Sequence, residues 1–197
     1  IRVIPFGIDI PENEVHGEVS RFALYHLGAM DWMPNVESIR WFLNEVWGKV
    51  HAAFPQATLY LAGRRMPDEF LTLQMEGVEV VGEVDDAEAF VASKAINIVP
   101  LLSGSGIRVK IIEAMAQGKT VIATHTGAEG INYTENENIL LADSPDAFVQ
   151  QIGRCLTDDA FCHRIGRGAR LLAEQEYDNK ILTQRLLELY RLLLEKD

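Results

Sequence analysis

Short apolar runs alternate with helical stripes along most of the chain. The apolar runs predict strands at residues 22–27, 57–62, 78–81, 95–100, 120–124 and 139–141. Apolar residues at helical spacing predict a helix that begins at Pro34 and places these residues on one face: Val36, Ile39, Phe42, Leu43, Val46, Trp47 and Val50. Further helices are expected at 86–93, at 107–117 and over nearly all of the chain from Asp146 onward. This alternation indicates an α/β fold, a Rossmann-like open parallel sheet with helices on both faces.

Three of the predicted strands are followed directly by a glycine, at Gly28, Gly63 and Gly82. Ligands of open α/β sheets bind beyond the carboxyl ends of the strands. We therefore expect Gly28, and the backbone around Gly82 and Val84, to border a ligand site, although a tight turn explains Gly28 equally well. Arg64 follows Gly63 and has the reach to contact a phosphate, but general surface statistics favour a solvated arginine there.

The clearest chemical signal is a loop rich in serine and glycine between the strand at 95–100 and the helix at 107–117. Unpaired backbone N–H groups and the positive end of the helix dipole meet at this point, which favours anion binding. Gly104 and Gly106 lack Cβ atoms, so a phosphate has close access to the backbone. The predicted anion-binding residues of the loop are Ser103, Gly104, Ser105, Gly106 and Ile107.

Two cations, Arg108 and Lys110, are expected in the first turn of the helix that follows this loop. Cations at a helix start oppose the dipole and carry a small local penalty. A bound diphosphate reverses that sign, because arginine offers it a forked contact and lysine a point charge. The two residues are therefore candidate diphosphate ligands.

Glu113 is the acidic residue of an otherwise apolar stretch, residues 111–116. A carboxylate on a core-facing helix is costly unless it is paired. The vicinal hydroxyls of a ribose are suitable donors to it. The alternative is an ion pair with Lys110 on a solvated helix face, in the less favourable order of charges.

Composition narrows the class of protein and its partners. The chain has 197 residues, of which 48% are hydrophobic and 24% charged, with a net charge of −11. These values suit one globular domain over residues 1–197. A surface this acidic repels phosphate backbones and anionic lipids, so we expect no nucleic-acid partner. No apolar run is long enough for a transmembrane segment.

The remaining residues exclude several chemistries. The histidines show no metal-ligand spacing, and no Walker-type loop or Gly-x-Ser-x-Gly sequence is present. Cys155 and Cys162 are expected as free thiols in a reducing, cytoplasmic compartment. The chain begins at Ile1 without an initiator Met or a signal-like apolar run, so we expect a fragment of a longer protein.

Three segments resemble a known family. Residues 113–123 are similar to the signature Glu-Ala-Met-Ala-x-Gly-x-Pro-Val-Val-Ala, and residues 127–131 resemble the glycine turn that follows it. Residues 4–9 look like the Pro-Asn-Gly-Val-Asp element at the start of the family's second domain, with Phe6 in place of the usual Asn. The chain thus resembles the carboxyl-terminal, donor-binding domain of a GT-B glycosyltransferase of the large retaining group often called family four.

The resemblance implies roles for the candidate residues. The family's Glu-x7-Glu pattern spans the loop, and its second Glu corresponds to Glu113, which is implied to hold the ribose. Its first Glu falls on Ser105, so the carboxylate that the family uses at the transferred sugar is absent. The usual Arg and Lys of the first strand–helix loop are also absent, and Trp32 lies in that region. We infer that Arg108 and Lys110 take over the diphosphate charge and, with Glu113, form the catalytic group.

The implied reaction is hexosyl transfer from a nucleoside-diphosphate sugar to an acceptor hydroxyl, without a metal or other cofactor. Charge on the leaving diphosphate dominates its barrier, and fixed N–H dipoles and cations are the expected catalytic device. The acceptor, a glycan or lipid-linked glycan of polysaccharide biosynthesis, is expected on an amino-terminal domain that this chain lacks. The fragment alone is therefore expected to bind donor and not to turn over.

The amphipathic tail, residues 178–197, is expected to pack partly on that missing domain. Without it, a self-associating apolar patch is expected at Leu182, Leu186, Leu187 and Leu193. Two alternatives stay open for the function as a whole. One is a nucleotide-sugar epimerase-like enzyme, and the other is a non-catalytic nucleotide-sugar-binding module, which the serine at position 105 keeps open.

Overall fold

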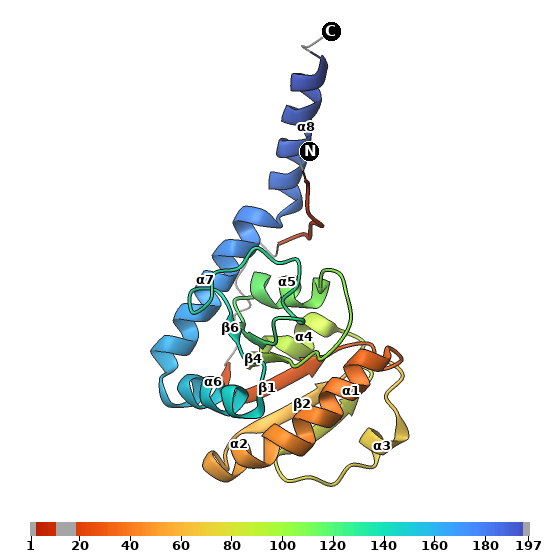
Figure 1. Ribbon diagram of the computed structural model, residues 1–197, viewed down its shortest axis with the longest axis vertical. Helices are drawn as coiled ribbons and strands as arrows, with labels where there is room; N and C mark the ends of the chain where they lie inside the picture. The colour runs from red at the N-terminus through yellow and green to blue at the C-terminus, as the bar shows by residue number, and fades with distance from the viewer. Residues whose placement is uncertain (1–2, 11–18, 195–197) are drawn as a thin grey trace.

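A computed structural model gives the structure of residues 3–10 and 19–194. Six strands form one sheet in the order β3-β2-β1-β4-β5-β6, and every neighbouring pair is parallel (Figure 1). The strands are β1 Ser20–Leu27, β2 Thr58–Ala62, β3 Val78–Gly82, β4 Lys94–Val99, β5 Thr120–Ala123 and β6 Leu140–Leu141. The predicted parallel α/β sheet is confirmed. The strand order reverses between β1 and β4, which is where open α/β sheets bind ligands.

The helices alternate with the strands as expected. They are α1 Met33–Phe42, α2 Gly48–Ala53, α3 Asp68–Leu71, α4 Ala87–Ala92, α5 Val109–Ala116, α6 Pro145–Thr157, α7 Asp159–Glu176 and α8 Asn179–Leu194, with a π-helical turn, η1, at Leu43–Trp47. The four residues of α3 are too few for a helical period to show in the sequence, and that helix was not predicted.

One face of the sheet is covered by α1, η1, α2 and α6. The apolar stripe predicted from Val36 to Val50 is buried there, and the burial continues through the π turn into α2. Phe42 and Phe148 meet edge to face at 5.5 Å between ring centroids, and both are fully buried. This face forms an apolar core that also takes in Leu24, Ile96 and Ile98 from the central strands.

The opposite face carries α4, α5 and α7. A second apolar core joins α5 and α7 to β5 through residues such as Ile112, Met115 and Ala173. The short helix α4 contacts the sheet at Phe90, whose ring meets Tyr25 edge to face at 6.0 Å. Because α4 has only six residues, the space between α4 and α5 is not filled by side chains.

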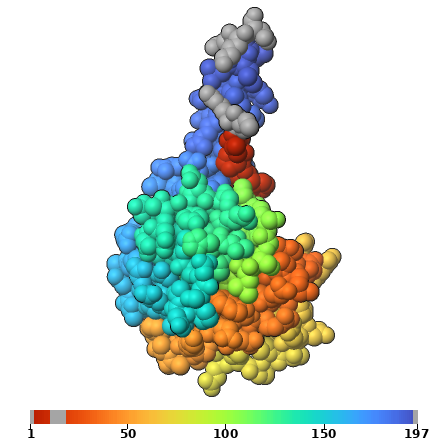
Figure 2. Space-filling model, viewed as in Figure 1, coloured from red at the N-terminus to blue at the C-terminus, as the bar shows by residue number. Residues whose placement is uncertain are grey.

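Helix α8 stands away from the rounded body of the molecule, with residues 3–10 beside its base (Figure 2). Ile8 exchanges backbone hydrogen bonds with Tyr177 and Asn179, at 2.8 and 2.9 Å. Leu182 is 5% exposed, so its expected place in an exposed patch is wrong: it packs on the backbone of Gly7. Leu187 and Leu193 are exposed, as expected. Within residues 3–10 and 19–194, no helix combines the length and apolar character that crossing a membrane requires.

Candidate functional site

A cleft of about 380 Å³ lies between α4 and α5, which run side by side on one face of the sheet (Figure 1). Its floor is made by Tyr25 and Leu27 of β1 and Asn97 of β4. Lys110 and Glu113 of α5 line one wall, and Glu88 of α4 lies on the other. Residues 6–9 and Asn179 close one end. The cleft therefore opens beside the strand-order reversal between β1 and β4, where open α/β sheets bind ligands.

Glu113 lies on the wall of this cleft rather than in the core. Its side chain is 40% exposed, and its Oε2 is 2.8 Å from Lys110 Nζ. The sequence argument took Glu113 for a core-facing carboxylate, and that premise is wrong because α5 turns this position toward the cleft. The ion pair with Lys110, the alternative considered from the sequence, is the contact that forms. An exposed pair of this kind contributes little stability, so either group is free to exchange it for a ligand.

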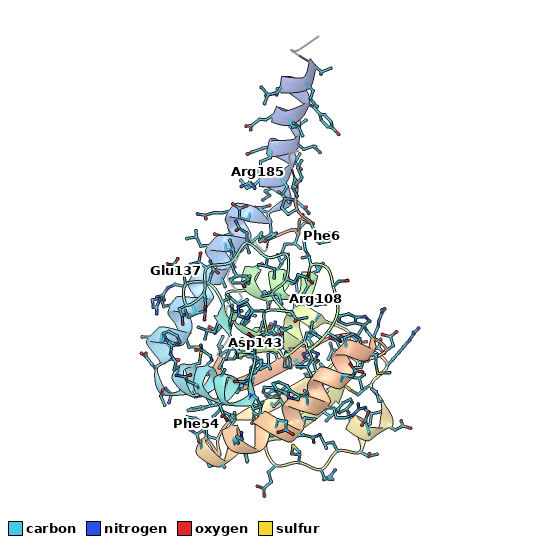
Figure 3. The ribbon with its side chains drawn as sticks, viewed as in Figure 1. Phe6, Phe54, Arg108, Glu137, Asp143 and Arg185 are labelled. Carbon is cyan, nitrogen blue, oxygen red and sulfur yellow. The ribbon has the colours of Figure 1, made fainter. Side chains whose placement is uncertain are left out.

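Arg108 lies directly before α5 and not inside its first turn, because the helix begins at Val109. Its Nη1 donates to the Ser105 carbonyl oxygen at 2.7 Å, and its guanidinium carbon lies 4.8 Å from the centre of the Trp32 ring. Its Nε and Nη2 are buried and donate to no other group of the described residues. Burial lowers the pKa of Arg108, with Glu129 opposing the shift. Figure 3 shows Arg108 at the loop before α5, on the side that faces α1.

The serine–glycine loop folds over this arginine. A Cβ at Gly104 would lie 2.6 Å from Arg108 Nη2 and 2.9 Å from the Trp32 ring, so only glycine fits above the stack. Gly104 and Gly106 have φ of +118° and +87°, values that favour glycine. The amide N–H groups of Gly104, Ser105 and Gly106 donate to no acceptor in the parts of the chain that the structure describes. Arg108 and these amides together form an array of free donors.

Of the site residues predicted from the sequence, Lys110 and Glu113 line the cleft, whereas Arg108 and the loop at 103–107 lie at the start of α5 outside its lining. The remaining ones are also outside it. Gly28 packs against His26 and Asn35, and a Cβ there would lie 2.9 Å from His26 Nε2. Arg64 lies 3.9 Å from Asp31, to which Arg65 also pairs, so the solvated arrangement holds at this strand end. Gly82 accepts a backbone hydrogen bond from Gly63, and Val84 is half-buried beyond it. Ser103 and Ile107 lie in the loop beside Arg108, outside the lining of the cleft.

Four residues at the site were not identified from the sequence as site residues. Trp32 is 76 positions from Arg108, and no local pattern indicates that the two stack. Tyr25 and Gln117 belong to segments that periodicity assigns to a strand and a helix without marking them as functional. Asn97 offered a signal, because it is a polar residue inside the apolar run at 95–100. A buried asparagine in such a run needs a partner.

The described residues hold no group of three or more His, Cys, Asp or Glu side chains arranged to bind a metal ion. Cys155 and Cys162 are free thiols, as expected, and both are buried.

The family assignment rests on a sequence-profile match that covers most of the chain. The sequence profile of the family described as "Glycosyl transferases group 1" matches residues 21–158. The chain belongs to the glycosyl transferases group 1 family. It corresponds to the carboxyl-terminal Rossmann-like domain of a GT-B glycosyltransferase, as the resemblance had indicated.

Individual relatives agree with this assignment. A Klebsiella pneumoniae protein described as "Uncharacterized 44.6 kDa protein in cps region" is 24% identical over 159 residues, 76% of this chain and 41% of that protein. The chain thus spans about two fifths of the length of the curated relative it matches.

Solved structures show the same fold. TarM of S. aureus, solved with fondaparinux, α-GlcNAc-glycerol and UDP, superposes with a TM-score of 0.76 at 15% identity, over 93% of this chain and 38% of TarM. Anabaena HepE, solved with UDP and glucose, superposes with a TM-score of 0.70 at 20% sequence identity. The match covers 96% of this chain and 56% of HepE. The C-terminal domain of LpcC from Francisella tularensis superposes with a TM-score of 0.65 at 16% sequence identity. The match covers 88% of this chain and all of that domain.

Proposed function

We propose that this chain is the donor-binding domain of a glycosyltransferase and that it binds a nucleoside-diphosphate sugar. The observation that carries the proposal is Arg108, whose Nε and Nη2 are buried without an acceptor. Buried N–H groups of a cation are costly unless they are paired. An anion that enters beside the loop supplies the missing acceptors. The amides of Gly104, Ser105 and Gly106, in the loop that contacts Arg108, add further donors.

Spacing along α5 fits the proposed donor. Lys110 and Glu113 follow Arg108 by two and five positions. A helix rises 1.5 Å per residue, so Glu113 lies about 7.5 Å further along the helix axis than Arg108. This span suits a nucleotide that sets its diphosphate at Arg108 and its ribose hydroxyls at Glu113. Binding would separate the Lys110–Glu113 pair, giving the lysine to the phosphates and the carboxylate to the ribose.

The proposed reaction moves the sugar from the donor to an acceptor hydroxyl. The bond between the anomeric carbon and the diphosphate oxygen breaks, the acceptor oxygen bonds to the same carbon, and the hydroxyl proton passes to the leaving diphosphate. Arg108, Lys110 and the loop amides stabilise the negative charge that develops there. We propose retention of configuration and no metal ion, with these groups in the place of a cation.

The whole protein completes the reaction in this proposal. TarM and HepE were both solved with UDP, and this chain matches only part of each. We propose that an amino-terminal domain brings the acceptor, a glycan or lipid-linked glycan, and that this chain alone binds donor without turnover. We place the reaction in the cytoplasm. Glycosyl transfer by the purified chain alone would contradict this division.

Calorimetric titration with UDP, GDP and ADP tests the proposal. We expect one of them to bind, and Arg108→Ala and Glu113→Ala each to lower its affinity at least tenfold, because losing a charged hydrogen-bond partner costs ~1.5–3 kcal/mol. Trp32→Ala should lower it about 3- to 10-fold by releasing the guanidinium, whereas Trp32→Phe should retain most of it. Arg64→Ala, a cation outside the cleft, is the matched control and should bind as wild type. Equal affinities for Arg108→Ala and wild type would refute the assignment.

A further inference from the structure

The floor of the cleft carries polar groups that have no partner. Tyr25 and Asn97 occupy paired positions on β1 and β4, so both side chains project to the same face of the sheet. They are 1% and 3% exposed, and both line the cleft. Within the described residues, the Tyr25 hydroxyl and Gln117 Oε1 are buried and make no hydrogen bond. The carboxamide of Asn97 lies beside them on the lining of the cleft. Buried polar groups are nearly always hydrogen-bonded, so two unpartnered ones on one cleft point to a ligand.

The character of the cleft indicates the kind of group that enters it. Burial and the nearby charge of Glu113 raise the pKa of Tyr25, so its hydroxyl remains a neutral donor. The carboxamide of Asn97 offers a donor and an acceptor beside it. Leu27 and Val91 add apolar surface. A neutral floor with apolar walls suits a flat, uncharged ring with hydrogen-bonding groups along one edge, and it disfavours a phosphate.

The direction of the bound nucleotide follows from α5. A donor whose diphosphate lies at Arg108 and whose ribose lies at Glu113 has its base on the far side of the ribose. Further along the helix, in that direction, the cleft is lined by Ala116 and Gln117 and floored by the strands. The Tyr25 ring is held in place by its edge-to-face contact with Phe90. The floor is therefore in place before a ligand arrives.

We propose that Tyr25 and Asn97 hydrogen-bond the edge of the donor's nucleobase and so set which nucleoside diphosphate this chain selects. This inference rests on the proposed function and adds the residues that distinguish one base from another.

Titration of the chain with UDP, GDP, ADP, CDP and inorganic pyrophosphate tests the inference. The variants are Tyr25→Phe and Asn97→Leu, with Tyr60→Phe, a tyrosine that contacts Lys94 outside the cleft, as the matched control. Each variant at the floor should lower the affinity for the preferred nucleotide about 3- to 10-fold, the usual net value of one hydrogen bond. The differences among the four nucleotides should narrow, and pyrophosphate binding should stay at the wild-type level.

The outcomes separate the inference from the function on which it rests. If wild type prefers one nucleotide and both floor variants keep that preference and affinity, the base is bound elsewhere and the inference fails alone. If neither nucleotides nor pyrophosphate bind to wild type, the proposed function fails and the inference fails with it. Thermal unfolding of each variant checks folding, and Asn97→Leu should be at least as stable as wild type because it places an apolar side chain at a position that is 3% exposed.

Discussion

The two faces of the central strands β1 and β4 differ in what their side chains contact. On the face toward α1 and α6, Leu24, Ile96 and Ile98 are fully buried in one continuous apolar core. On the face toward α4 and α5, Tyr25 and Asn97 are as deeply buried but meet a cleft. Burial alone therefore does not distinguish core from site. What distinguishes them is whether a buried side chain carries a polar atom that makes no hydrogen bond within the protein, as the Tyr25 hydroxyl does.

The comparison assigns different tasks to the two faces. Apolar burial contributes stability in proportion to the area removed from water. Buried polar groups without partners reduce stability, and they persist where they serve a ligand. The α1 and α6 face therefore serves stability alone, whereas the α4 and α5 face combines a second apolar core with the cleft to which we attribute ligand selection.

The largest expected difference in stability comes from replacing one residue on each face. Phe42→Ala removes a fully buried ring from the apolar core and should lower the free energy of unfolding by about 3–5 kcal/mol. Asn97→Leu, on the other face, should leave it unchanged or raise it. Urea unfolding of both variants measures the difference. A larger loss for Asn97→Leu than for Phe42→Ala would reverse our assignment of the faces.

A smaller effect on stability is expected when a fall in pH protonates His26. This residue follows Tyr25 in β1 and is 4% exposed. Its Nδ1 lies 3.0 Å from the Ile98 carbonyl oxygen, while its Nε2 has no partner among the described residues. Burial lowers the pKa of His26 from 6.5 to about 4, against the opposing hydrogen bond to Ile98. The unfolded chain thus takes up a proton near pH 6.5, and the folded chain does so only near pH 4.

The stability that neutral His26 contributes is therefore fully present above pH 6.5 and is lost as the pH falls toward 4. The loss attributable to this residue is about 3 kcal/mol at most, at 1.36 kcal/mol for each pH unit between the two values. Urea unfolding of wild type and of His26→Gln between pH 7 and 4 measures this loss. The carboxyl groups titrate alike in the two proteins, so the difference between their pH profiles is due to His26. Parallel pH profiles for the two proteins would exclude His26 as the source.

The strands could be predicted because each is a short apolar run that ends at a turn residue. This pattern is local in the sequence and does not depend on distant contacts. The sequence also predicted the loop before α5, since Gly104 and Gly106 are conformational signals, and anion binding by that loop stays a prediction. It placed Leu182 wrongly, because burial of that side chain depends on Gly7, 175 positions away. Which neighbour meets Glu113, and which ring lies under Arg108, depends likewise on tertiary contacts that no period in the sequence encodes.

The most direct test of the account is the side-chain N–H signal of Arg108. Its Nε–H group has no acceptor in the described structure, so we predict that saturating UDP, GDP or ADP, whichever binds, moves this ¹⁵N–¹H resonance downfield and slows its exchange with water. Arg108→Lys identifies the resonance by its loss. The Arg64 signal, from a solvated arginine outside the cleft, serves as the internal reference and should not move. A bound nucleotide that leaves the Arg108 signal unchanged would contradict the central claim that this arginine holds the diphosphate.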